Sequence, residues 1–312
     1  MSSKTKKLTF AQKVSKHKQL IPFVLPAILF ALIFCYLPMA GIVIAFKDNP
    51  NFMRYDVFEA LQRADWTLEH FEMIFSDPEI FRVVRNTLII SVMKIVILFP
   101  LPVILAVMIT ELRSQKFSKL VQGLVFLPHF FSWVVIVGIF NSLFGLYGPI
   151  NNIVEALGGT PTHFMGEPLW FRWLVVILSG WKEIGYSSIV YIAAIMSIDP
   201  SLYEAAKIDG ASKLKQIWNI TIPSIMPTII VMLIIRIGYL MDAGFEQVYA
   251  MLNANTMSTG DIIGTFVYRK AMGAESNYGL STAVGLINGL ISMGLILGAN
   301  YFSKKKTGSG VW

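Results

Sequence analysis

The residues of this chain that are capable of acid–base, nucleophilic or metal chemistry do not gather into a catalytic group. His129 and His163 lie far apart in the sequence, and no acidic residue recurs at the spacing of metal ligands. The single cysteine, Cys35, lies inside an apolar run, so a buried packing role is expected and no disulfide can form within the chain. There is no phosphate-binding loop and no nucleophile elbow in the sequence. We therefore predict no enzyme, no metal site and no bound cofactor.

A second group of polar residues is more informative, because its members lie in long apolar runs. Lys94, Lys182, Glu183 and Arg236 interrupt such runs, and Asp242 follows the end of one. Charges inside a membrane are costly and usually face a cavity or a partner, so they indicate binding of a polar solute. In the alternative interpretation, the charges form internal pairs and the aromatic residues lie at the membrane interface. The candidate substrate-pathway residues are Lys94, Trp133, Trp181, Lys182, Glu183, Tyr186, Tyr239 and Asp242.

The elements that position these residues must be membrane-spanning helices. The chain has 312 residues, of which 55% are hydrophobic and 14% charged, whereas a soluble domain carries roughly 25% charged residues. Lipid permits only helices or closed barrels, and the apolar runs are longer and more continuous than barrel strands. We therefore predict an all-α, polytopic membrane protein with six transmembrane helices, over residues 20–46, 86–110, 120–146, 170–197, 222–242 and 279–302.

The distribution of basic residues predicts how these helices are oriented. Residues 1–19 form a basic cytoplasmic or interfacial segment, residues 20–302 the transmembrane domain, and residues 303–312 a cytoplasmic tail. With the N-terminus inside, the cytoplasmic segments carry fifteen Lys and Arg residues and the external segments eight. The positive-inside rule then places both termini in the cytoplasm. This bias also explains the net charge of +7, so nucleic acid is not an expected partner.

The segment 199–223, between the fourth and fifth predicted spans, contains the clearest local signals. Asp199 is typical of a helix N-cap, and Pro200 of the first helical position. Gly210 can take the left-handed conformation that ends a helix, and Ser212 can cap a second one. We expect two short helices that meet at an angle on the cytoplasmic face. A partner protein could bind them there and move them as a rigid body.

At these residues the sequence resembles the membrane subunits of binding-protein-dependent ABC importers. Their signature is Glu-Ala-Ala, three residues, Gly, nine residues and then Ile-x-Leu-Pro, and the present sequence keeps this spacing. It departs from the signature at Ile222, which replaces leucine conservatively. The residues to which the resemblance assigns coupling with an ATPase are Glu204, Ala205, Ala206, Asp209, Gly210, Ile220 and Pro223.

The resemblance also implies a fold and a set of partners. It implies the type I ABC importer permease fold in a bacterial plasma membrane, with a second homologous permease subunit completing the pathway. An ABC ATPase dimer would bind ATP and Mg²⁺, and an extracellular or lipid-anchored solute-binding protein would deliver the solute. The stretch from Trp181 to Gly185 is similar to the polysaccharide and oligosaccharide permeases of the carbohydrate-uptake branch, which implies an oligosaccharide or a related carbohydrate as substrate.

Two alternatives remain open at this point. The signature concerns the ATPase contact rather than the cargo, so an importer permease for a non-sugar solute fits it equally. A secondary carrier would need inverted repeats and paired midplane carboxylates, whereas only Glu183 lies well inside a span. In the last span, Gly285 with Gly289 and Gly294 with Gly298 are spaced for close helix packing. For these pairs we expect packing within the chain ahead of packing against another subunit.

Overall fold

The computed structural model describes residue 19 and residues 21–273, 276–308 and 310–311. Within these residues the chain is helical, and the β contact present is an isolated antiparallel bridge between Lys47 and Trp66. The predicted all-α fold class is therefore confirmed. The predicted N-terminal basic segment falls almost entirely on residues 1–18, which lie outside the described residues.

The long apolar helices agree with a six-span membrane protein. In the described part of the chain, five stretches are long and apolar enough to cross a membrane, and a sixth is obtained when the bent pair α10–α11 counts as one span. The stretches are α2, η2 and η3 (Ile21–Ala31, Leu32–Tyr36, Leu37–Phe46); α5, η4 and α6 (Pro78–Met93, Lys94–Leu98, Pro100–Thr110); α8 and α9 (Trp133–Phe144, Pro149–Ala156); α10 (Pro168–Met196) with α11 (Pro200–Ile208); α12, η7 and α13 (Lys213–Gln216, Ile217–Thr221, Ile222–Gly238); and α17 (Tyr278–Thr307).

The predicted third span, 120–146, is interrupted in the structure. Helix α7 (Gln115–Phe126) passes into a short 3₁₀ turn, η5 (Leu127–Phe130), and α8 starts afresh at Trp133. Pro128 has no backbone N–H to donate to the preceding turn, and the Ser132 hydroxyl caps α8 by accepting a hydrogen bond from Val135 N at 3.4 Å. The stretch that is long and apolar enough to cross a membrane starts at Trp133 and ends at Ala156, so the predicted bounds 120–146 are wrong.

The ends of three other spans also differ from the prediction. The second span starts at Pro78 rather than 86, because the Asp77 carboxylate caps it by accepting from Glu79 N at 2.7 Å. The fifth span runs over 213–238 rather than 222–242, because α12 continues through a π turn into α13. The last helix reaches Thr307, so the start of the predicted tail 303–312 is helical.

Helix α10 lies at the centre of the molecule. It packs most extensively against α6 and also contacts α7, α13 and α15. The approach to α7 is so close that a side chain at Gly185 would overlap the Val125 carbonyl. Apolar residues of α10 such as Phe171 and Leu178 are fully buried in the main core. The helix that carries Lys182 and Glu183 is therefore held rigidly by its neighbours.

The connection between the fifth and sixth spans is a packed helical region, which the sequence analysis did not predict. It comprises α14 (Phe245–Met251), η8 (Ala254–Thr256), α15 (Met257–Gly260) and α16 (Ile263–Met272). The Asn86 amide of α5 donates to the carbonyls of Ser258 and Asp261 at 3.2 and 3.1 Å. Arg172 of α10 donates in turn to the Asn86 side chain at 2.8 Å. These contacts fix the region against two spans.

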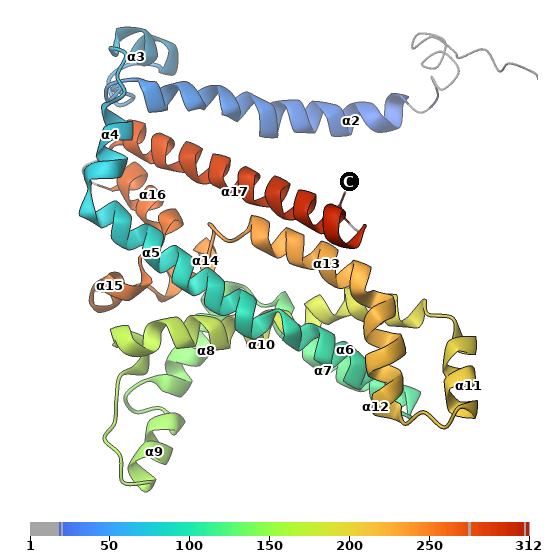
Figure 1. Cartoon of the computed structure of the whole chain (residues 1–312). Helices are drawn as coiled ribbons and strands as arrows, with labels where there is room; N and C mark the ends of the chain where they lie inside the picture. The colour runs from blue at the N-terminus through green and yellow to red at the C-terminus, as the bar shows by residue number, and fades with distance from the viewer. Residues whose placement is uncertain (1–18, 20, 274–275, 309, 312) are drawn as a thin grey trace, which may run out of the picture.

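The two ends of the molecule carry different features. Figure 1 shows α3 (Val57–Arg63), α4 (Glu69–Ser76) and α15 at one end. Helices α11 and α12 and the end of α17 lie at the opposite end. The segment 199–223 and the C-terminal helix end therefore share one side of the molecule.

The first span and the glycines of the last span are left uncovered by the chain itself. None of the apolar window of the first span is buried, and its packing against α17 is made by η3. Cys35 of η2 is exposed, so the buried packing role expected for it is wrong. A Cβ added at Gly285, Gly289, Gly294 or Gly298 would meet no atom within 4 Å. The expectation that these glycines pack within the chain is therefore wrong. Within the described residues their faces are open.

Candidate functional site

Helix α11 is built by the local signals that the sequence indicated. The Asp199 carboxylate accepts a hydrogen bond from Ser201 N at 2.9 Å, and Pro200 occupies the first turn. Hydrogen bonds from the Ser201 backbone and side chain lower the pKa of Asp199 below its ordinary value, so the cap is charged at neutral pH. The helix leaves α10 at a bend of 69°. It therefore projects away from the axis of the fourth span.

The turn after α11 depends on Gly210. Its φ of +72° lies in the left-handed region, and its backbone N–H donates to the Lys207 carbonyl at 3.1 Å. Ser212 then caps the following helix, accepting from Lys215 N at 3.4 Å. The sequence analysis predicted a separate short helix here. In the structure this second helix instead continues into the fifth span, with Pro223 in the first turn of α13.

The signature residues of segment 199–223 form an exposed surface. Glu204 and Ala205 are exposed, Ala206 is half-buried, and no residue of α11 is buried. In the described residues the Glu204 carboxylate has no hydrogen bond or ion pair. Segment 199–223 also exposes large apolar side chains, since Ile208 is 87% exposed and Trp218 68% exposed. Exposed apolar side chains in a segment that also presents an unpaired carboxylate are typical of a surface that binds another protein.

Within the spans, Lys94 joins three helices through a buried polar network. Its ammonium donates to the Ala243 carbonyl at 2.9 Å and to Gln247 Oε1 at 2.8 Å. Gln247, which is fully buried, also accepts from Ser179 Oγ at 2.6 Å and donates to the Val175 carbonyl at 2.7 Å. The partly buried ammonium of Lys94 is thus hydrogen-bonded to neutral acceptors, which offsets part of the cost of removing it from water.

An ion pair next to this network links α10 with α13. Arg236 donates to Glu183 Oε2 at 2.9 Å, and both side chains are about one-third exposed. The pair borders a cavity of about 220 Å³, into which Lys94 also faces. The lining brings together four predicted pathway residues and Arg236, and it comprises Ser91, Lys94, Ile95, Glu183, Arg236, Tyr239, Asp242, Ala243 and Gly244.

The adjacent Lys182 has a different role. Its ammonium donates to the backbone carbonyls of His129 and Phe131, the former at 2.7 Å, and lies 5.3 Å from the centre of the Trp133 ring. These carbonyls belong to the interruption between α7 and α8, where the helix hydrogen-bond pattern ends. A cation is favourable there, because the carbonyls at a helix C-terminus are unpaired and carry partial negative charge. Lys182 therefore holds the interruption between α7 and α8 against α10.

The remaining predicted aromatic residues pack on protein side chains instead of lining the cavity. Tyr186 stacks on His129 with ring centres 3.7 Å apart, and Trp181 contacts Phe140 edge-on at 5.6 Å. Trp133 packs against the main core. The structure thus gathers Lys94, Glu183, Tyr239 and Asp242 and separates them from Trp133, Trp181, Lys182 and Tyr186.

Some residues of the cavity and its network were missed by the sequence analysis. Gln247 and Ser179 are uncharged and lie in ordinary apolar surroundings, so no sequence signal marks them. Gly244 adopts φ +88° beside the Lys94 ammonium, and the turn-forming run Asp242–Gly244 was a usable signal. The Ser91 hydroxyl is buried without a hydrogen-bond partner in the described structure and lines the cavity.

Similarity to known proteins extends over almost the whole chain. The polygalacturonan/rhamnogalacturonan transport system permease protein YteP of Bacillus subtilis is 38% identical over 99% of this chain and 95% of its own length. Protein LplB of the same organism is 38% identical over 98% of this chain and 95% of its own. A permease subunit with this architecture is therefore known from at least one sugar-polymer transport system.

Solved structures show the same fold. A chain of a bacterial ABC transporter involved in import of the acidic polysaccharide alginate superimposes with a TM-score of 0.86 and 36% identity, over 95% of this chain and 99% of that one. A chain of the alginate transporter bound to an alginate pentasaccharide-bound periplasmic protein gives 0.85 and 36%, over 97% and 99%. Residues 98–306, which include segment 199–223 and most of the cavity, match the family described as binding-protein-dependent transport system inner membrane components. This chain belongs to that family.

Proposed function

We propose that this chain is the permease subunit of an ATP-driven, binding-protein-dependent carbohydrate importer, with an oligosaccharide as the transported solute. The observation that carries the proposal is the exposed helix α11, in which Glu204, Ala205 and Gly210 keep the importer spacing. The names of the relatives supply the substrate class, because the permease YteP and the alginate transporter both serve sugar polymers.

Helix α11 is the element that binds the ATPase. It has no buried residue, and the small side chains of Ala205 and Ala206 let a partner surface approach closely. Glu204 is free to pair with a basic residue of the ATPase, while Asp209 and Gly210 form the turn. Ile220 lies in η7 and Pro223 in the first turn of α13, so both belong to the fifth span, which follows this helix in the chain. The ATPase dimer binds ATP with Mg²⁺ and hydrolyses the ATP, and this chain has no catalytic step of its own.

The orientation follows from the position of α11. An ATPase that uses cellular ATP must contact α11 from the cytoplasm, so that end of the molecule is cytoplasmic. The end of α17 lies on the same side, which supports a cytoplasmic C-terminus (Figure 1). With six spans the N-terminus is then cytoplasmic as well. The opposite end, with α3 and α4, receives the solute-binding protein.

The polar cavity contributes to the sugar pathway. Ser91 Oγ, the Tyr239 hydroxyl and the Asp242 carboxylate have no hydrogen-bond partner in the described structure, so they are available to sugar hydroxyls. Lys94 and the Glu183–Arg236 pair complete the wall. The volume of about 220 Å³ is below the usual ligand-site range of about 300–1,000 Å³. The cavity therefore accommodates part of an oligosaccharide, and a second subunit must supply the remaining contacts.

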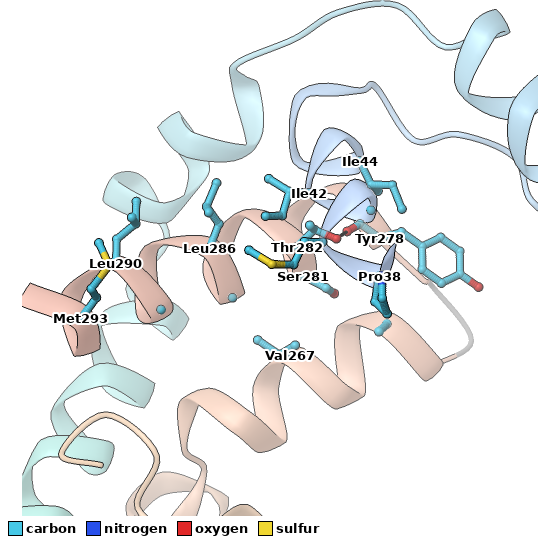
Figure 2. A pocket seen from close by; sticks show the side chains of 15 residues that line it. Pro38, Ile42, Ile44, Val267, Tyr278, Ser281, Thr282, Leu286, Leu290 and Met293 are labelled. Carbon is cyan, nitrogen blue, oxygen red and sulfur yellow. Dashed lines mark hydrogen bonds between the residues drawn. The ribbon is translucent and has the colours of Figure 1, made fainter. Parts of the chain in front are cut away.

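A second, homologous permease covers the surfaces that this chain leaves open. A groove of about 680 Å³ lies between η3, α16 and α17. Figure 2 shows Pro38 and Ile42 of η3 facing Val267 of α16 and Leu286 of α17 across it. Gly285 and Gly289 form part of its floor and leave room for a close helix. The first span, whose apolar window has no residue buried within the chain, presents a further apolar face. A transmembrane helix of the second permease fits these surfaces.

Transport follows an alternating-access cycle. ATP closes the ATPase dimer, which draws the two α11 helices together and turns the cavity outward, and hydrolysis resets it. The cycle advances because ATP and the loaded binding protein have different affinities for the two states. No covalent bond of the sugar changes.

The test uses the complete importer in membrane vesicles, with the solute-binding protein and labelled oligogalacturonate and alginate oligosaccharides as candidate solutes. We expect ATP-dependent uptake by the wild-type assembly, and its loss in Glu204→Lys with sugar capture by the binding protein unchanged. The matched control is Glu155→Lys in α9, a charge reversal outside segment 199–223. Normal uptake by Glu204→Lys, or ATP-independent uptake by this chain alone, would contradict the proposal.

A further inference from the structure

A polar cavity of about 290 Å³ lies where the segment 199–223 meets the second span. Its walls come from the end of α6, the end of α10, and helices α11 and α12 with η7. Glu111, Tyr203, Lys213 and Gln216 are among the residues that line it. This cavity is separate from the polar cavity in the spans and shares no residue with it.

The polar contact across this junction is an ion pair between residues far apart in the sequence. Lys213 Nζ, in the first turn of α12, lies 2.6 Å from Glu111 Oε2. Glu111 is the C-cap residue of α6 and ends the second span. Among the described residues, this pair is the one ion pair or side-chain hydrogen bond that joins segment 199–223 to the rest of the chain.

Two further hydrogen bonds stiffen the segment itself. The Tyr203 and Thr221 hydroxyls lie 2.9 Å apart and connect α11 to the start of the fifth span. Gln216 is buried, and its amide donates to the Ala211 carbonyl at 2.9 Å, which holds the turn after Gly210. With these two contacts, α11 and the fifth span move as one body.

The polar cavity in the spans has one wall on the second span and another on the fifth span. Lys94 and Ser91 belong to the second span, while Arg236 belongs to the fifth. The fifth span is continuous with segment 199–223 through the backbone. The second span shares an apolar cluster with Ile222 and Ile225, and its polar link to the segment is the ion pair between Glu111 and Lys213. A displacement of α11 therefore reaches one wall through the backbone and the other through this apolar cluster and the ion pair.

We propose that Glu111 and Lys213 are positioning residues that transmit the movement of α11 to the second span, so that both walls of the sugar cavity move together. This inference rests on the proposed function. Both side chains are partly exposed, with side-chain exposures of 33% and 64%, so the pair contributes little to folding stability. Its role is instead to keep two elements in register while a partner moves one of them.

The experiment compares charge reversals in the complete importer, using labelled oligogalacturonate and alginate oligosaccharides. Glu111→Lys and Lys213→Glu are each expected to lower the number of sugars imported per ATP hydrolysed, by roughly three- to tenfold. The double variant restores opposite charges in swapped positions, and its number of sugars imported per ATP hydrolysed is expected to return to within about twofold of the wild type. Arg113→Glu, close to Glu111 and without a polar partner in the described structure, serves as the control with an unchanged ratio.

The outcomes separate the inference from simpler explanations. A merely structural role would lower the amount of assembled complex and reduce uptake and ATP hydrolysis in parallel, which leaves the ratio unchanged and overturns the inference. A double variant as uncoupled as the single variants overturns it as well. The proposed function is tested by the wild-type assembly in the same vesicles, because absence of ATP-driven uptake there would refute that function independently.

Discussion

Replacement of Gly210 by alanine tests segment 199–223, and the free-energy cost of this substitution can be worked out from the structure. Gly210 has φ +72°, and a Cβ added there would meet no atom within 4 Å. The cost of Gly210→Ala is therefore the intrinsic strain of the left-handed conformation, about 1–2 kcal/mol, with no steric clash. This strain shifts the balance between the bent turn and other conformations by a factor of about 5–30.

The assay measures binding-protein-stimulated ATP hydrolysis and sugar uptake in vesicles, together with the thermal unfolding of the purified importer. We expect Gly210→Ala to reduce stimulated hydrolysis and uptake several-fold, because α11 is no longer held in the orientation that the ATPase binds. Gly210→Asn is expected to be milder, since asparagine tolerates the left-handed region better than alanine.

Gly158 provides a matched control for this substitution. It has φ +83°, and the space at its Cβ position is also open. Gly158→Ala therefore introduces the same backbone strain in the connection between α9 and α10, outside segment 199–223. Equal losses of uptake in Gly158→Ala and Gly210→Ala would refute the reasoning, as would wild-type uptake in Gly210→Ala.

Two further substitutions probe the spans. Lys94→Met leaves the acceptors at Ala243 and Gln247 without their donor, and we expect the free energy of unfolding to fall by about 1–3 kcal/mol. Thermal unfolding in detergent measures this loss, and Lys116→Met, at an exposed position, is the control that should leave stability unchanged. Gly289→Leu projects a side chain into the groove beside η3, so the second permease is expected to copurify in smaller amounts. Because no atom of this chain lies within 4 Å of the added Cβ, its protease resistance should stay unchanged, and undiminished copurification would argue against the groove as the subunit contact.

The sequence was sufficient to predict the elements that depend on local chemistry. The cap at Asp199, the first-turn proline at Pro200 and the left-handed glycine at Gly210 all act within a few residues, and the structure confirms each. The apolar spans were predicted for a similar reason, because lipid requires a length and composition that can be read directly from the chain. Several of their ends moved, at caps such as Asp77 and Ser212, and the third span is interrupted at Pro128.

The features that depend on long-range packing could not be predicted. Nothing in the sequence shows that Gln247 reaches Lys94 or that Glu111 reaches Lys213, since these partners are separated by 153 and 102 positions. Lys182 and Glu183 illustrate the same difficulty. They are adjacent in the sequence, yet Lys182 contacts the interruption between α7 and α8 while Glu183 contacts α13. Helical periodicity alone could not show which of the two side chains lines the cavity.

The charges around the cavity bear on how the importer distinguishes its solutes. Lys94 and Arg236 are balanced by Glu183 and Asp242, so these four formal charges sum to zero. An acidic sugar would have to compete with Glu183 for Arg236, because that carboxylate already lies 2.9 Å from the guanidinium. Sugar hydroxyls meet no such competition at Ser91, Tyr239 or Asp242. Under the proposed function, we therefore expect selection for acidic sugars to come from the solute-binding protein or the second permease, and this cavity to bind the hydroxyls that all oligosaccharides share.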